Sequence, residues 1–243
     1  MVAESHEPVK AFLAVLIFAF LAGSSSGGET PAIIQNPRTL KGTGVRYYLS
    51  LPTDWNATKV WPIVVTIDGA GHNFEGNFRG FVGARGREPF IILTPCVSSN
   101  GNDPADLQAV LGMVKEVQQE FSGQPKFFMT GFSAGGHVTW QVVFGHPELL
   151  AGAALSAANF RFRGVDEISK APEIARLPIR SFQGDRDGFI APLTEQWNDA
   201  VELARQHGYA AFTRTMVPGA GHQAFQREVM AWFASLLPAS KPQ

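Results

Sequence analysis

Residues 126–136 read Lys-Phe-Phe-Met-Thr-Gly-Phe-Ser-Ala-Gly-Gly. An apolar run precedes the pattern Gly131-x-Ser133-x-Gly135, and a segment of helical character follows it. This combination is typical of a nucleophile elbow, a strained strand-to-helix turn that lifts a serine hydroxyl out of a sheet. Glycines are expected on both sides of the serine because side chains there would collide in so sharp a turn. Ser133 would then lie at a helix N-terminus, where free backbone N–H groups favour a developing negative charge.

The chain also offers an acid and a base for this serine. Residues 184–188 (Gly-Asp-Arg-Asp-Gly) and residues 218–222 (Pro-Gly-Ala-Gly-His) are glycine-rich turns that each follow an apolar run. The order Ser, Asp, His along the chain is that of α/β-hydrolases. We therefore expect Ser133 to be the nucleophile, His222 its general base, and Asp187 the acid that orients the imidazole.

Two aspartates compete for the acid role, since both Asp185 and Asp187 follow Gly184. A catalytic acid must leave the end of its strand and turn back toward the histidine N–H. Gly188 permits such a turn directly after Asp187, whereas Asp185 lies beside Gly184 and a basic residue, as a turn carboxylate does. We therefore assign the acid role to Asp187.

An oxyanion hole is required because charge builds on the substrate carbonyl oxygen. The backbone N–H of Ala134 is the expected first donor. The second donor is expected from the loop at residues 67–72 (Ile-Asp-Gly-Ala-Gly-His), and we choose the N–H of Ala70, although a plain glycine-rich turn is the alternative. Asp68 is unusual at the end of an apolar strand, so we expect it to be buried and paired. His72 either lines the site or has a structural role.

Length and composition limit the classes of function. The chain has 243 residues with 45% hydrophobic and 17% charged residues, which suits one α/β domain with a sizeable core. The net charge of −1 gives no electrostatic case for nucleic-acid binding. Cys96 is the only cysteine, so an intramolecular disulfide and cysteine-rich zinc sites are excluded. We see no other metal-ligand spacing, and we expect neither a metal nor another cofactor.

The N-terminus has the character of a targeting segment. Residues 11–22 are almost wholly apolar, Lys10 precedes them and a Gly/Ser-rich stretch follows. This pattern predicts a secretory signal peptide cleaved near residues 23–26, because the apolar run is short for a membrane span. An uncleaved anchor is the alternative. We thus expect a signal peptide and small-residue linker at 1–28, a single domain at 29–243, and a secreted or periplasmic protein without a stable membrane span after cleavage.

Apolar runs and helical patterns alternate along the rest of the chain. The expected strands cover residues 45–52, 61–67, 90–93, 127–132, 151–155, 179–182 and 210–217, and the expected helices cover residues 103–121, a segment after residue 133, and residues 193–207 and 224–237. Short apolar strands alternating with helices predict a doubly wound, mostly parallel sheet flanked by helices.

Four stretches resemble a known group of enzymes. They are residues 131–136 (Gly-Phe-Ser-Ala-Gly-Gly), residues 144–153 after them, the spacing Gly184-x-x-Asp187-x-x-Ile190-x-Pro192, and residues 219–222 (Gly-Ala-Gly-His). They resemble the secreted α/β-hydrolase esterases of the polyhydroxybutyrate-depolymerase, feruloyl-esterase and acetylxylan-esterase type, from residue 45 to the final helix. The resemblance implies the α/β-hydrolase fold and a metal-free Ser-His-Asp esterase. Those enzymes usually carry His-Gly where this chain has Asp68-Gly69.

The expected function is hydrolysis of a carboxylic ester through an acyl-enzyme intermediate. Residues 159–177 are too few to build a large lid, so a short-chain or polymer-attached ester suits the site better than a lipid chain. A serine peptidase of the prolyl-oligopeptidase type shares the triad order, but we see no N-terminal propeller of that family in this sequence. A non-catalytic binding protein with the same fold is the other alternative, although all three triad members are present.

Overall fold

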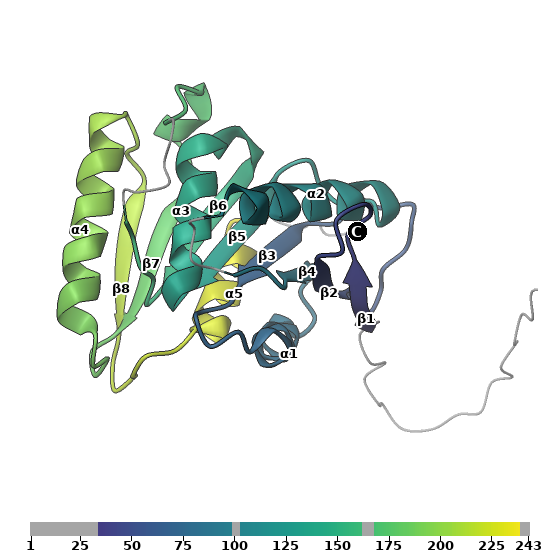
Figure 1. The fold of residues 1–243 in the computed structure, drawn as a ribbon, viewed down its shortest axis with the longest axis horizontal. Helices are drawn as coiled ribbons and strands as arrows, with labels where there is room; N and C mark the ends of the chain where they lie inside the picture. The colour runs from purple at the N-terminus through teal and green to yellow at the C-terminus, as the bar shows by residue number, and fades with distance from the viewer. Residues whose placement is uncertain (1–33, 99–102, 162–167, 239–243) are drawn as a thin grey trace, which may run out of the picture. The chain divides into compact units, whose positions relative to one another are not determined.

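The structure is a computed structural model that describes residues 34–98, 103–161 and 168–238. Its central feature is an eight-stranded sheet with the order β1-β2-β4-β3-β5-β6-β7-β8 (Figure 1). The strands are β1 Ile34–Thr39, β2 Arg46–Ser50, β3 Ile63–Ile67, β4 Ile91–Pro95, β5 Phe127–Phe132, β6 Leu150–Ser156, β7 Ile179–Gly184 and β8 Phe212–Val217. Strand β2 pairs antiparallel with β1 and β4, and all other pairs are parallel. The mostly parallel sheet expected from the alternation of elements is therefore present.

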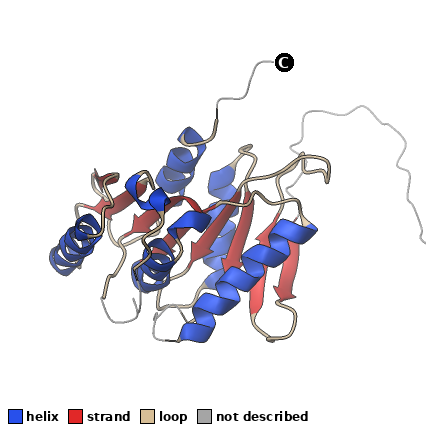
Figure 2. Ribbon diagram, turned by 90° about the horizontal axis from the view of Figure 1, so that it is seen from above, coloured by secondary structure: helices blue, strands red, loops and turns tan. Residues whose placement is uncertain are grey.

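Helices cover both faces of this sheet (Figure 2). Helices α1 Phe74–Arg85 and α5 Gln226–Ser235 pack on one face, and they contact each other. Helices α2 Pro104–Glu120, α3 Gly136–Gly145 and α4 Ile190–Gln206 pack mainly on the other face. Three short 3-10 turns complete the helical elements: η1 Ser133–Gly135, η2 Pro147–Leu149 and η3 Pro172–Ala175. The sheet thus lies between two apolar layers.

The alternation of side chains along the central strands explains the continuous apolar runs of the sequence. In β3, Ile63, Val65 and Ile67 belong to the apolar cluster on the α2, α3 and α4 side, whereas Val64 belongs to the opposite cluster. Every residue of β3 and β4 is buried. A strand covered on both faces has no solvent-facing side, so each of its positions favours an apolar side chain.

Local signals determine where α2 begins. The Asp103 side chain accepts a hydrogen bond from the Ala105 N–H at 2.9 Å, and Pro104 occupies the first turn, where a missing N–H does no harm. Val110 and Met113, one turn apart, lie fully buried against the sheet. The helix expected from residue 103 to 121 is thereby confirmed, with both ends within one residue.

Two elements were not expected from the sequence. Helix α1 contains Gly76, Gly80 and Gly83, and glycine lowers helix propensity by about 1 kcal/mol per residue in a helix interior. The burial of its phenylalanines, Phe78 and Phe81, against the sheet compensates for this weak propensity. The edge strand β1 has a polar sequence, Ile-Gln-Asn-Pro-Arg-Thr, and lacks the apolar pattern of a strand.

The expected signal peptide and linker, residues 1–28, lie outside the described residues, as does the expected start of the domain at residue 29. All described elements belong to one compact unit. Within the described part of the chain, no helix combines the length and the apolar character that a membrane span requires. The short segment from residue 159 to 177, apart from residues 162–167, holds only the 3-10 turn η3 and no lid helix.

The parallel strands bring the expected functional residues to one edge of the sheet. Loops at the carboxyl ends of β5, β7 and β8 carry Ser133, Asp187 and His222, respectively. The loop after β3 and the loop after β6 leave from the same edge, because both strands run parallel to β5. Ligands of open α/β sheets bind at this carboxyl edge.

Candidate active site

Ser133 occupies the strained turn that its sequence motif predicts. It follows β5 directly, opens the 3-10 turn η1, and has a φ of 49°. A non-glycine residue in this left-handed region costs of the order of 1–3 kcal/mol and persists only where the surrounding structure enforces it. Such a strained serine between strand and helix is the geometry of a nucleophile elbow.

The glycines around Ser133 are required by close packing. A Cβ atom on Gly131 would lie 2.3 Å from the backbone oxygen of Gly135, and a Cβ on Gly135 would lie 2.6 Å from the backbone oxygen of Asp68. A Cβ on Gly136 would lie 2.5 Å from the backbone oxygen of Asn159. All three obstacles are backbone atoms that cannot move aside. The expected role of Gly131 and Gly135 is therefore confirmed, and Gly136 shares it.

Asp187 and His222 are in direct contact. Oδ2 of Asp187 lies 2.8 Å from Nδ1 of His222, and the Asp187 side chain is fully buried. The same carboxylate accepts hydrogen bonds from the Gln183 side chain and from the Phe189 N–H, each at 2.8 Å. A carboxylate bound to Nδ1 leaves Nε2 as the imidazole nitrogen that can take a proton from a nucleophile.

The surroundings of Asp187 keep it ionised. Burial by itself raises the pKa of the Asp187 carboxyl, but the hydrogen bonds from Phe189, His222 and Gln183 outweigh it, so this pKa lies below its usual value. A role for Gln183 was not expected from the sequence. Its signal is weak, because a buried glutamine at the end of β7 differs little from any polar strand end.

Asp185, the other candidate acid, binds a backbone group rather than the imidazole. Its Oδ1 accepts a hydrogen bond from the Gly219 N–H at 2.7 Å. This contact joins the loop after β7 to the loop that carries His222. Asp185 is thus a turn carboxylate that stabilises the His222 loop, whereas Asp187 holds the imidazole itself.

Two aromatic rings flank His222. The Phe132 ring centroid lies 4.9 Å from that of His222. The Phe189 ring centroid lies 5.2 Å from that of His222, and these two rings are in an edge-to-face arrangement. Phe189 is 59% exposed, which is unusual for so large an apolar side chain. The two phenylalanine rings restrict the rotation of the imidazole. They also form an apolar surface at the mouth of the site.

Ser133 and His222 line one cavity of about 280 Å³ at the carboxyl edge of the sheet. The remaining lining residues are Asn159, Phe189, Pro192, Leu193 and Gln196. Among the described residues, Ser133 and His222 share the cavity without a direct hydrogen bond, as is common before substrate binds. The structure therefore brings the three expected triad residues to one place and joins two of them directly.

Two polar residues of this cavity, Asn159 and Gln196, were missed in the sequence. The Asn159 N–H donates to the backbone oxygen of Ser133 at 2.9 Å, so the loop after β6 is tied to the elbow. Gln196 lies on the cavity side of α4 with Leu193, one turn earlier on the same helix. Position at a strand end could have indicated Asn159, but nothing in the sequence distinguishes Gln196 from the other polar residues of α4.

The two segments that carry the expected oxyanion donors lie near Ser133. Ala134 follows it in the first turn of η1, where N–H groups have no intrahelical acceptor. A Cβ atom on Gly69 would lie 3.3 Å from the Cβ of Ser133, so the loop after β3 reaches the elbow. The His72 N–H donates to the Gly69 oxygen, which closes a turn with Ala70 inside it.

Asp68 and His72 shape this loop. Asp68 is 6% exposed, and its buried Oδ2 has no partner among the described residues. Burial raises its pKa, while hydrogen bonds from the backbone N–H groups of Gly69 and Asn73 act in the opposite direction. The expected burial of Asp68 is confirmed. His72 is exposed and contacts the Ser98 oxygen at 3.0 Å, which is a structural role.

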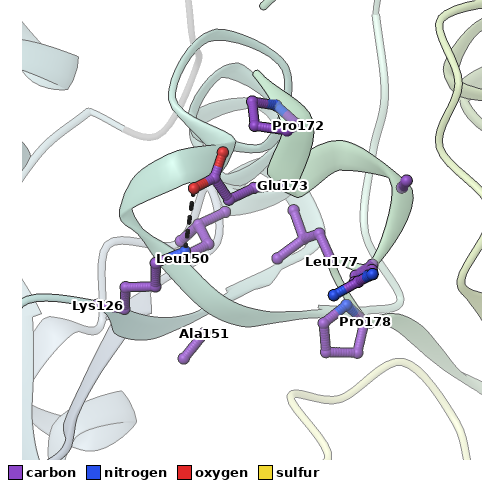
Figure 3. A pocket seen from close by; sticks show the side chains of 9 residues that line it. Lys126, Leu150, Ala151, Pro172, Glu173, Leu177 and Pro178 are labelled. Atoms are coloured by element: carbon purple, nitrogen blue, oxygen red, sulfur yellow. Dashed lines mark ion pairs between the residues drawn. The ribbon is translucent and has the colours of Figure 1, made fainter. Parts of the chain in front are cut away.

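A larger hollow of about 680 Å³ lies at the opposite, amino-terminal edge of the strands. Leu150, Leu177 and Pro178 form part of its wall, and the Lys126–Glu173 ion pair, 3.6 Å between charged atoms, crosses it (Figure 3). It contains no serine, cysteine or histidine. The smaller cavity is therefore the candidate active site. Within the described residues, no three His, Cys, Asp or Glu side chains are grouped to hold a metal ion.

The fold is shared with solved hydrolases. A thermostable esterase is 21% identical with a TM-score of 0.59, over 85% of this chain and 60% of its own. LpqC, a poly(3-hydroxybutyrate) depolymerase from Bordetella parapertussis, is 16% identical with a TM-score of 0.63, over 84% and 89% of the two chains. Poly(aspartic acid) hydrolase-1 from Sphingomonas sp. KT-1 is 16% identical with a TM-score of 0.64, over 85% and 97%. The chain has the α/β-hydrolase fold.

The α/β-hydrolase fold agrees with the expectation from the sequence motifs. The esterase and the depolymerase are of the kind that those motifs resemble. No protein-family model and no curated protein matches the chain. At these sequence identities the likeness establishes the fold, and the chemistry must be argued from the site.

Proposed function

We propose that the protein is a serine hydrolase that cleaves carboxylic esters through a Ser133–His222–Asp187 triad. The observation that carries the proposal is the buried Asp187 carboxylate bound to His222 Nδ1 at 2.8 Å, with Ser133 in the same cavity as that imidazole. An oriented histidine beside a strained serine at a helix N-terminus is the arrangement that acyl transfer requires.

In the first step Ser133 Oγ attacks the ester carbonyl carbon. His222 Nε2 takes the serine proton, and the carbonyl π electrons move to the oxygen, which becomes an oxyanion. The N–H groups of Ala134 and Ala70 are the proposed donors to that oxyanion. When the tetrahedral intermediate collapses, the bond to the alkoxy oxygen breaks and His222 gives its proton to the leaving alcohol, so an acyl-serine remains.

In the second step water replaces the alcohol. His222 takes a proton from the water as it attacks the acyl carbon, and the bond to Ser133 Oγ breaks with return of the proton to the serine. The products are a carboxylic acid and free enzyme. Asp187 stays ionised throughout and stabilises the imidazolium that forms twice in the cycle.

The dimensions of the site support a small ester, alone or attached to a polymer. The cavity of about 280 Å³ is at the small end for ligand sites, and the exposed Phe189 at its mouth can contact a larger body that remains outside. Neither nucleic acid nor a membrane is needed as partner. We also propose that the N-terminal segment directs export of the protein. The intact mass of the exported protein tests this proposal, and a mass equal to that of the chain from Met1 would exclude cleavage.

A substrate comparison tests the reaction class. Purified protein and a Ser133→Ala variant are assayed with p-nitrophenyl acetate and butyrate and with aminoacyl p-nitroanilides. Ester turnover that depends on Ser133, with little anilide turnover, supports the proposal. Faster anilide turnover would favour the peptidase alternative, and no turnover of either class would favour a binding protein.

A further inference from the structure

Two polar side chains of the active-site cavity have no task in the proposed reaction. Asn159 and Gln196 line it together with Phe189, Pro192 and Leu193. The other walls of the cavity are thus mainly apolar. A polar pair in an otherwise apolar wall fixes orientation and selectivity in ligand pockets.

The contacts of Gln196 determine which way its carboxamide faces. The Phe160 backbone N–H lies 2.8 Å from Gln196 Oε1, and a backbone N–H can only donate. The Asn159 Nδ2 donates to the same oxygen at 3.3 Å. The oxygen therefore faces the loop after β6, and a flipped amide would place two donors opposite each other.

The amide nitrogen of Gln196 is consequently left for the cavity. Gln196 is half-buried, and its Nε2 has no partner among the described residues. Because two hydrogen bonds hold the oxygen, the nitrogen is pre-organised and loses little freedom when it donates to a ligand. The cavity that Ser133 lines thus also presents a fixed hydrogen-bond donor.

We propose that Gln196 is a specificity-determining residue whose Nε2–H group donates to an oxygen atom of the substrate. The enzyme then prefers esters with an ether, hydroxyl or carbonyl oxygen in the group that enters the cavity over their all-carbon counterparts. This inference rests on the proposed ester hydrolysis. An alkyl group would strip water from the amide and give nothing in return, which is the basis of strong discrimination by polar sites.

The test compares two pairs of isosteric esters in which one methylene becomes an ether oxygen. For the acyl side they are p-nitrophenyl 3-methoxypropanoate and p-nitrophenyl pentanoate. For the alcohol side they are 3-methoxypropyl acetate and pentyl acetate. The quantity measured is the oxygen-to-carbon ratio of kcat/KM, divided by the same ratio for hydroxide-catalysed hydrolysis, which removes differences in intrinsic reactivity.

Three variants isolate the donor. Gln196→Glu keeps an oxygen that accepts from Phe160 but removes the amide donor, and Gln196→Met removes both polar groups at similar size. Gln206→Glu introduces the same charge at the exposed end of the same helix and is the control. Circular dichroism and thermal unfolding confirm that each variant is folded.

The expected result is a ratio above 1 for one pair in the wild type and in Gln206→Glu, and a fall of about 5- to 50-fold in both Gln196 variants. The pair that responds identifies whether the acyl or the alcohol group occupies the cavity. A loss of activity that affects both members of a pair equally, with the ratio unchanged, would overturn the inference and leave ester hydrolysis standing. Absence of turnover of all four esters by the wild type would overturn the proposed function and the inference with it.

Discussion

Asp187 contacts His222 at 2.8 Å between Oδ2 and Nδ1, and two further hydrogen bonds hold the same carboxylate. Its second oxygen accepts the Phe189 N–H, and Gln183 donates to the first. The imidazole is therefore oriented by an acid that is itself fixed on three sides. This relationship connects β7, the start of α4 and the loop after β8, which are the parts of the fold that the proposed chemistry needs.

Replacing the nucleophile should separate activity from folding. In Ser133→Ala we expect kcat for p-nitrophenyl butyrate to fall by roughly 10³-fold or more, because the proposed acyl-enzyme forms on this serine. Ser133→Gly should be as inactive as Ser133→Ala. Its free energy of unfolding should be at least that of the alanine variant, because glycine adopts a φ of 49° without the steric cost of a Cβ. Steady-state kinetics and urea unfolding measure both. A stable alanine variant that keeps full activity would remove Ser133 from the mechanism.

The two neighbouring aspartates should differ sharply. Asp187→Asn is expected to lower kcat by roughly 10²- to 10⁴-fold, since the imidazole loses its oriented tautomer and the charge that supports its protonated form. Asp185→Asn should have a far smaller effect, because an asparagine oxygen can still accept from the Gly219 N–H. Kinetics of both variants with one ester decide the matter, and the opposite ranking would transfer the acid role to Asp185.

The Asp187 substitution should also change the pH dependence of stability. Its folded pKa lies below the unfolded value, which is about 3.9, so the ionised carboxylate stabilises the fold at pH values above the unfolded pKa. That contribution disappears as the pH falls through the folded pKa, where a protonated Asp187 resembles asparagine. The stability difference between wild type and Asp187→Asn should therefore be largest near neutral pH and shrink below about pH 4. Urea unfolding at several pH values measures it; a difference that grows in acid contradicts the assignment.

Glycine substitutions test the elbow independently of catalysis. Gly131→Ala would place a Cβ 2.3 Å from the Gly135 oxygen, so we expect destabilisation of about 1–3 kcal/mol or more and loss of activity. Gly188→Ala is the matched control, because nothing lies within 4 Å of the Cβ it would add. Chemical unfolding of the two variants is compared. If Gly131→Ala were as stable as Gly188→Ala, the close packing around Gly131 would not be needed for the fold.

Acyl-chain length tests the size of the site. A cavity of about 280 Å³, with no lid helix in the described part of residues 159–177, should accept acetyl and butyryl groups and leave most of a palmitoyl chain in water. We expect kcat/KM to decrease from butyryl to palmitoyl p-nitrophenyl esters measured below their aggregation concentrations. Faster palmitoyl turnover would contradict this prediction and require an apolar channel beyond the cavity.

Much of the fold could be predicted from local patterns. The buried strands β3, β4 and β5 are continuous apolar runs because helices cover both faces, and Asp103 and Pro104 mark the start of α2. Helix α1 could not be predicted in this way. Its helical state depends on the burial of Phe78 and Phe81 by tertiary packing, which overrides the weak propensity of its glycines.

The candidate site was predictable where chemistry leaves a motif. Ser133, Asp187 and His222 each lie in a glycine-rich turn after an apolar strand, and parallel strands bring such turns to one edge. Gln183 and Gln196 leave no such mark, because their roles arise from contacts across the fold rather than from their neighbours in sequence. The assignments of Ala134 and Ala70 to the oxyanion hole stay predictions, since they concern a charge that exists only during the reaction.

Labelling with a fluorophosphonate tests the central claim most directly, because the reagent reacts with a serine only where a base activates it and an oxyanion hole supports attack. The wild-type protein is treated with the probe, digested, and analysed by mass spectrometry alongside Ser133→Ala and Asp187→Asn. The account predicts one adduct, on the peptide that contains Ser133, formed in step with loss of ester hydrolysis, much slower in Asp187→Asn and absent from Ser133→Ala. An unlabelled Ser133 in folded protein, or an adduct on another residue that abolishes hydrolysis, would contradict it.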